Sequence, residues 1–122
     1  MDEFKSCRVI CTDEFLEWYD DLPDKDSDAV TQAVTLLELG GIALGTPHSS
    51  SVSGSKFPFR ELRPKQGHSP LRVIYVFDPQ RDALLLIGGD KSGDKRFYPK
   101  IIARSEAIYE QYLDERQGES HE

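Results

Sequence analysis

Two arginines, a lysine and a tyrosine lie at or near the ends of predicted strands, where distant parts of the chain can meet. Arg63 ends one predicted strand, Arg72 is near the start of the next, Lys91 follows a third, and Tyr98 comes soon after. Because antiparallel neighbours place the end of one strand beside the start of the next, these cations are expected to share one end of the sheet. Cations with an aromatic ring can bind a phosphate, stack a base and stabilise a phosphoryl-transfer transition state.

Each of these residues also has a purely structural interpretation. Arg72 can pair with Glu61 on the neighbouring strand, and we give this pairing about the same weight as phosphate contact. Lys91 and Lys95 lie in a polar loop, where lysines are commonly only solvated. Tyr98 can equally be a core aromatic. The residue types alone therefore leave both interpretations open.

The distribution of charge favours a positive surface on a negative body. The chain has 122 residues and a net charge of −7. Counted along the sequence, residues 1–53 carry −8, residues 54–104 carry +6 and residues 105–122 carry −5. A basic middle segment of this kind attracts polyanions, and phosphate backbones are the commonest of them.

Familiar metal and nucleotide motifs do not fit the chain. The run over 88–95 resembles a P-loop, but Asp94 stands where the Walker A motif needs lysine. The same run has too few acidic residues for an EF-hand, and the sequence holds no HExxH helix and no G-x-S-x-G elbow. We therefore expect neither a metal nor a cofactor. His48 and His68 are by default surface histidines, and His68 is the better candidate for proton transfer because it lies in the turn between the two arginine strands.

The sequence is that expected of a cytoplasmic protein. No stretch approaches the roughly 20 apolar residues of a membrane span, and the start Met1-Asp2-Glu3 is acidic and lacks an apolar signal region. On one strand, Cys7 and Cys11 would lie about 13 Å apart, whereas a disulfide tolerates about 7 Å. Both are predicted to be free thiols.

The hydrophobic spacing divides the chain into strands of period two and amphipathic helices. Thr12 is expected to cap the first helix, Pro23 to end it, and Gly40-Gly41 to end the second. The Gly-, Ser- and Pro-rich stretch that follows is expected to be a mobile loop. The predicted elements are a strand over 5–11, helices over 13–22 and from about Asp26 to Gly40, the loop over 43–58, strands over 59–63, 71–78 and 83–90, and a last helix from Pro99.

This order, β-α-α-β-β-β-α, indicates the α+β class. We predict an antiparallel sheet core, because the last three strands have short connections, with the helices packed on one face and the basic residues on the other. The length suits a single domain, which we place over residues 1–116, followed by a flexible acidic tail over 117–122.

Several blocks of the sequence, in this order, resemble the RelE/HigB superfamily of toxins, and most closely its phage-derived, HigB-like branch. The resemblance covers about residues 8–113. The blocks that carry it are Phe15-Leu-Glu-Trp-Tyr, Glu61-Leu62-Arg63-Pro64, the strand Leu71-Arg72-Val73-Ile74-Tyr75-Val76-Phe77-Asp78-Pro79, Gly89-Asp90-Lys91-Ser92-Gly93, and Tyr98 with the helix behind it.

The resemblance implies a RelE-like fold and the toxin of a type II toxin–antitoxin pair, neutralised by a cognate antitoxin of helix-turn-helix type. Such toxins cut mRNA on the ribosome without a metal, through attack of the ribose 2′-hydroxyl on the adjacent phosphate. Carried over to this chain, Arg63 and Arg72 would hold and neutralise the scissile phosphate, Lys91 would stabilise charge or act as base, and Tyr98 would stack on or orient the nucleotide. The other residues expected to contact RNA are Lys65, His68, Lys95 and Arg96.

A non-catalytic interaction module is the rival hypothesis, because relatives on this fold can inhibit a protein target such as DNA gyrase and phage-derived copies can lose activity. One structural feature separates the two. If Arg63, Arg72 and Lys91 converge on an open concavity, the nuclease is favoured. If they are buried and paired with Glu61, the binding module is favoured.

Overall fold

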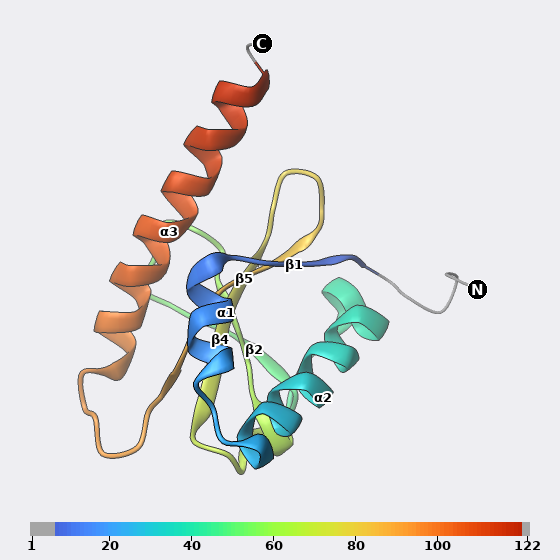
Figure 1. Ribbon diagram of the computed structural model, residues 1–122, viewed down its shortest axis with the longest axis vertical. Helices are drawn as coiled ribbons and strands as arrows, with labels where there is room; N and C mark the ends of the chain where they lie inside the picture. Colours follow the sequence, from blue (N-terminus) through green and yellow to red (C-terminus); the bar gives the residue numbers. More distant parts are fainter. Residues whose placement is uncertain (1–6, 121–122) are drawn as a thin grey trace.

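The computed structural model describes residues 7–120, which form one sheet and three α-helices (Figure 1). The predicted α+β class is confirmed. Residues 5 and 6 of the predicted first strand and residues 121–122 of the predicted tail lie outside the described residues. The elements are β1 (Val9–Cys11), α1 (Asp13–Asp20), α2 (Asp24–Gly40), the 3₁₀ turn η2 (Gly41–Ala43), β2 (Ser49–Ser51), β3 (Arg60–Leu62), the turn η3 (Pro64–Gly67), β4 (Leu71–Phe77), β5 (Ala83–Asp90) and α3 (Phe97–Ser120).

The five strands form a mixed sheet in the order β1-β5-β4-β3-β2. The antiparallel pairing of β3, β4 and β5 is confirmed, whereas β1 runs parallel to β5. The stretch predicted as a mobile loop contains β2, which pairs with β3. The prediction missed this strand because a run of three serines has no apolar alternation. Its pairing uses backbone hydrogen bonds, which any side chain permits.

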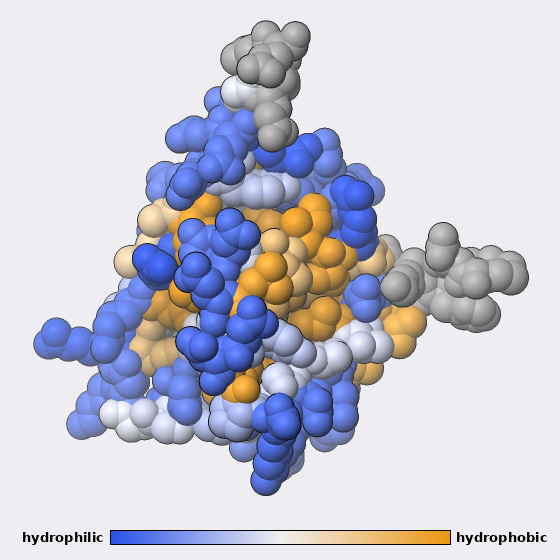
Figure 2. Space-filling view, viewed as in Figure 1, coloured by the Kyte–Doolittle hydropathy of each residue, from blue (hydrophilic) through white to orange (hydrophobic). Residues whose placement is uncertain are grey.

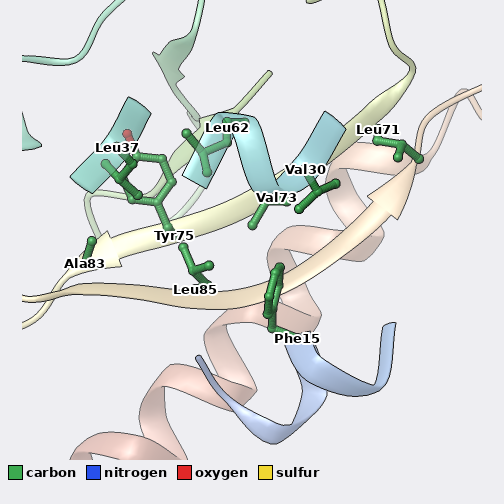
Figure 3. Close-up of a cluster of buried hydrophobic side chains, with 10 residues drawn as sticks. Phe15, Val30, Leu37, Leu62, Leu71, Val73, Tyr75, Ala83 and Leu85 are labelled. Carbon is green, nitrogen blue, oxygen red and sulfur yellow. The ribbon is translucent and has the colours of Figure 1, made fainter. Parts of the chain in front are cut away.

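The helices cover both faces of the sheet, so the prediction that they share one face is wrong for α3. On one face α1 and α2 enclose a core in which Phe15, Val30 and Leu37 meet Tyr75 and Leu85 of the central strands (Figure 3). On the other face α3 packs its apolar side against the sheet. The physical reason is that β4 and β5 bury side chains on both faces, as a central strand does when both sides are covered.

Thr12 joins the first strand to the first helix and confirms the predicted cap. Its Oγ1 accepts a hydrogen bond from the Phe15 N–H at 3.0 Å and donates one to the Leu86 carbonyl at 2.7 Å. At the other end of the fold, α3 begins at Phe97, two residues before Pro99, and continues through residues 117–120. Figure 1 shows this C-terminal part of α3 extending beyond the sheet.

None of the helices in the described part of the chain combines the length and apolarity needed to cross a membrane. Figure 2 shows hydrophilic residues along the upper part of α3, with apolar residues gathered in the middle of the same face.

Two adjacent glycines in β5 let helices approach the sheet on opposite sides. A Cβ atom built on Gly88 would lie 2.3 Å from the Trp18 ring of α1, and one on Gly89 would lie 2.9 Å from the Phe97 ring of α3. Any residue other than glycine would place its Cβ atom too close to one of these rings, because non-bonded heavy atoms do not approach a Cβ so closely. The glycine pair therefore fixes how near α1 and α3 come to β5.

We expect Gly88→Ala to lower the free energy of unfolding by about 1–3 kcal/mol, because the added methyl group overpacks the contact with the Trp18 ring. The smaller entropy gain of alanine over glycine does not offset this clash. Chemical denaturation measures the effect. Gly45→Ala is the matched control, since its Cβ would meet nothing within 4 Å. Equal stability of the two variants would contradict the assigned role of Gly88.

Candidate functional site

On the face of the sheet that α3 covers, several polar side chains contact one carboxylate, that of Glu61. Glu61 lies in the middle of β3 and pairs in register with Ser50 of β2 and Ile74 of β4. Its side chain is only 5% exposed. A carboxylate this buried is stable only where hydrogen bonds and positive charges replace its water, and its neighbours supply both.

Four side chains surround this carboxylate, and with Glu61 they form what we call the Glu61 cluster. Tyr98 Oη donates a hydrogen bond to Oε1 at 2.7 Å. Ser50 Oγ and Arg63 Nη1 donate to Oε2 at 3.0 and 3.1 Å. Arg72 Nε lies 3.8 Å from Oε1, which is an ion pair without a hydrogen bond. The cluster therefore contains one acid, two guanidinium groups and two hydroxyls.

Arg72 is among the largest fully buried side chains of the protein, at 2% exposure. It lies opposite Gly89 in the sheet register, on the face that α3 covers. Its Nη1 donates to the Ser69 and Leu71 carbonyls, both at 2.7 Å, and its Nε has no hydrogen-bond partner. The pairing with Glu61 that the sequence left open is thus present, and the guanidinium has little contact with solvent.

Glu61 lines a hollow of about 350 Å³, together with Tyr98, the end of β2 and the chain after it. We call this the Tyr98 hollow; its lining residues are Ser51, Val52, Ser53, Glu61 and Tyr98. A second hollow of about 420 Å³, mostly apolar, adjoins it through Ser53 and Tyr98 and extends along the start of α3. Tyr98 is therefore placed between the carboxylate and the open surface.

The pKa of Tyr98 is raised above that of an ordinary tyrosine, first because its hydroxyl is partly buried. The hydrogen bond to the Glu61 carboxylate raises it further, since a negative acceptor favours the protonated phenol. The positive charge of Arg72 acts in the opposite direction. Tyr98 therefore remains a neutral hydrogen-bond donor at physiological pH.

The remaining predicted site residues lie outside the Glu61 cluster. Lys91 is exposed in the loop after β5, and its backbone N–H bonds to the Pro70 carbonyl, beside the start of β4. Within residues 7–120, its side chain has no hydrogen bond or ion pair with the cluster. Lys65 and His68 are exposed in the turn after β3, and Lys95 and Arg96 are exposed just before α3.

On the criterion set from the sequence, the two arginines favour the binding module. Arg63 and Arg72 converge, but on Glu61, and Arg72 is buried. The sequence predicts Glu61 only as a structural partner of Arg72, and it predicts no role for Ser50. One signal pointed to Glu61: strand alternation places it on the same face as buried Phe59, where an unpaired acid is rare. Ser50 gave no such signal.

In the described residues, no three histidine, cysteine, aspartate or glutamate side chains are grouped so that they could hold a metal ion. Cys7 and Cys11 are free thiols, as predicted.

Comparison with known proteins identifies several relatives. The family described as Phage derived protein Gp49-like matches residues 17–110. The chain is 37% identical over 112 residues to "Putative toxin HigB3" of Mycobacterium tuberculosis, covering 90% of this chain and 96% of that protein. It is 34% identical over 99 residues to "Putative toxin HigB2" of the same organism, covering 79% of this chain and about half (49%) of that protein.

A solved structure shares the fold at low sequence identity. It is the archaeal RelE–RelB complex from Pyrococcus horikoshii OT3, in which one chain aligns with a TM-score of 0.53 at 16% identity. The alignment covers 72% of this chain and 98% of that chain.

We expect Glu61→Gln to lower the pKa of Tyr98, because the neutral amide no longer favours the protonated phenol. Two causes then remain: burial, the largest single cause, which raises the pKa, and the positive charge of Arg72, which lowers it. NMR of ring-labelled tyrosine across a pH series measures it. The control is Glu106→Gln, which removes a carboxylate from the adjoining hollow that is not among the causes of the Tyr98 shift. An unchanged Tyr98 pKa in Glu61→Gln would contradict the hydrogen bond.

Proposed function

Because the chain belongs to the Phage derived protein Gp49-like family, within the RelE/HigB superfamily, we propose that it is the toxin of a type II toxin–antitoxin pair. Two relatives carry the name of HigB toxins, and the related archaeal RelE was solved in complex with RelB. These names support a cognate antitoxin as the partner of this chain. We further propose that it acts in the cytoplasm and that its antitoxin is of helix-turn-helix type.

The activity that we propose is cleavage of mRNA on the ribosome. The ribose 2′-hydroxyl attacks the adjacent phosphate and gives up its proton, the bond from O2′ to phosphorus forms, and the bond to the 5′-oxygen breaks. The departing 5′-oxygen takes up a proton. The products are a 2′,3′-cyclic phosphate and a 5′-hydroxyl, and a positioned base is the main requirement.

The observation that carries this proposal is that Glu61 faces a hollow with hydrogen-bonding neighbours already in place. A carboxylate can accept the 2′-hydroxyl proton, a role for which Lys91 is the candidate that the resemblance implies. Arg63, beside it, can stabilise the negative charge that develops on the phosphate, and Tyr98 can orient the nucleotide or stack on it. Glu61 is thus our candidate for the general base.

The cations outside the cluster suit contact with the rest of the RNA. We propose that Lys91 assists charge stabilisation and that Lys65, His68, Lys95 and Arg96 contact the RNA backbone. All five are exposed, on the turn after β3 or on the loops around the start of α3. They belong to the one positively charged segment of the chain, which supports binding of a polyanion by an otherwise acidic protein.

A second candidate function is favoured by the burial of Arg72. Arg72 is 2% exposed, and its guanidinium donates hydrogen bonds to two backbone carbonyls. These contacts are typical of an arginine with a structural role. If the cluster only supports the sheet, the protein is a non-catalytic module that inhibits a protein target, such as DNA gyrase, or an inactive phage-derived relative. The two functions differ in whether RNA is cut.

We expect production of the chain without its antitoxin to stop growth and to cut mRNA, and Glu61→Gln to reduce cleavage by about a hundredfold or more, as loss of a general base does. Because this change leaves Arg72 buried without its counter-charge, Tyr98→Phe serves as a milder second variant that removes one hydroxyl. Primer extension on cellular mRNA measures cleavage, and thermal unfolding checks that each variant is folded.

Glu110→Gln is the matched control for this experiment, because it removes a carboxylate from the exposed face of α3. Growth arrest by wild type without mRNA cleavage would establish the non-catalytic module instead. Full cleavage by folded Glu61→Gln would remove Glu61 from the mechanism.

We expect purified wild-type protein to cut ribosome-bound mRNA equally well before and after removal of its bound metals, because 2′-hydroxyl attack needs a base and cations but no metal. The purified toxin is treated with EDTA and dialysed, and the magnesium that ribosomes need is then supplied. Mass spectrometry of the fragments should find 2′,3′-cyclic or 3′-phosphate ends. Restoration of a lost activity by one particular transition metal, or 5′-phosphate ends, would contradict this mechanism.

A further inference from the structure

A small hollow of about 130 Å³ lies on the other side of Arg63, between α2 and the turn after β3. It is separate from the Tyr98 hollow. We call it the basic hollow, and its lining comes from three segments: Ala29, Gln32, Ala33 and Leu36 of α2, His48 before β2, and Arg63, Lys65 and Gln66 after β3.

The ionisable groups that line the basic hollow are all basic, namely Arg63, Lys65 and His48. The amides of Gln32 and Gln66 add hydrogen-bond donors. Three of the four α2 residues that line the hollow are apolar, namely Ala29, Ala33 and Leu36. Cations beside apolar side chains attract an anion more strongly than cations spread in water.

Arg63 connects the basic hollow to the Glu61 cluster. Its Nη1 bonds to Glu61 at 3.1 Å, while its Nε is buried and has no hydrogen-bond partner. Gly67 packs against the same guanidinium so closely that a Cβ there would lie 2.8 Å from Nη2. The arginine is thus held in place with one buried donor unused, which is uncommon in folded proteins.

The turn that carries Lys65 has an unusual backbone. Lys65, Gln66 and Gly67 take positive φ values of 56°, 58° and 91° in succession. For lysine and glutamine this is an unfavourable conformation, of the kind that persists where surrounding structure or function requires it. Here it brings Lys65 and Gln66 to the rim of the hollow.

We propose that the basic hollow binds a backbone phosphate of the RNA, next to the phosphate that reacts at Glu61. This inference rests on the proposed function. RNA fits better than an acidic protein segment because Arg63 contacts both places, so an anion in the hollow lies one side chain away from the Glu61 carboxylate. A nucleic acid strand supplies a phosphate at every nucleotide, and can therefore occupy both places at once.

The test is binding of a single-stranded 2′-O-methyl oligonucleotide, which cannot be cut, so that binding is separated from catalysis. Lys65→Asn removes one charge and keeps a residue that tolerates positive φ. Arg81→Asn is the matched control, because Arg81 also has positive φ (67°) and lies in the β4–β5 hairpin, at the opposite end of β4 from the turn after β3. Fluorescence anisotropy at several salt concentrations gives the affinity and its salt dependence.

We expect Lys65→Asn to weaken binding by about threefold to tenfold and to reduce the slope of log affinity against log salt by about 0.7, the value of one phosphate contact on a single strand. Arg81→Asn should behave as wild type, and Gln32→Glu, which adds a carboxylate to the hollow, should weaken binding more.

Equal slopes in Lys65→Asn and Arg81→Asn, or no binding by wild type, would overturn the inference. Variants that lose antitoxin binding but keep RNA binding would assign the hollow to a protein partner instead. Cleavage of RNA is tested separately, by the Glu61→Gln variant.

Discussion

The burial of β4 and β5 on both faces is the constraint on which the rest of the structure depends. Alternate side chains of these strands need apolar cover on opposite sides, so α1 and α2 occupy one face and α3 the other. The candidate site follows from this arrangement. Because α3 must lie across the sheet, its first turn brings Tyr98 over β3, where Glu61 is found. Because α2 must cover the other face, it forms one wall of the basic hollow beside Arg63.

The Glu61 cluster lies under this cover, and its energetics differ from those of a surface ion pair. Arg72 is out of water, and its charge is offset by a carboxylate at 3.8 Å and by two backbone carbonyls. Removing one member of a buried pair leaves the other charge uncompensated, at a cost of about 3–5 kcal/mol, although replacing both by apolar groups is often neutral. A buried ion pair therefore adds little stability over apolar residues, and the general-base role that we propose for Glu61 is a functional reason for an acid at this position.

Much of the fold could be predicted because local sequence patterns indicate where its helices and strands lie. Thr12, with Asp13 and Glu14 after it, marks the start of α1, and the alternation from Leu71 to Phe77 marks β4. The position of α3 could not be predicted in the same way. Its own stripe shows only that one side is buried, and the need to cover both faces of β4 appears only when the whole sheet is considered. The strand β2 was missed because Ser49–Ser51 pairs through its backbone. In the candidate site, the types of Arg63, Arg72 and Tyr98 were informative. The role of Glu61 as their common partner depends on three segments meeting, which no spacing within one segment reveals.

Because Gly88 contacts the Trp18 ring, the side chains at these two positions, 70 residues apart in the chain, compete for the same space. A side chain can be added at position 88 only if the ring at position 18 becomes smaller, so the effects of substitutions at the two sites should not add. Sequences of this fold are then expected to vary at the two positions together, with a small residue at one accompanying a large residue at the other. Such covariation would show that the short distance between α1 and β5 is kept even in chains whose sequences are otherwise little alike.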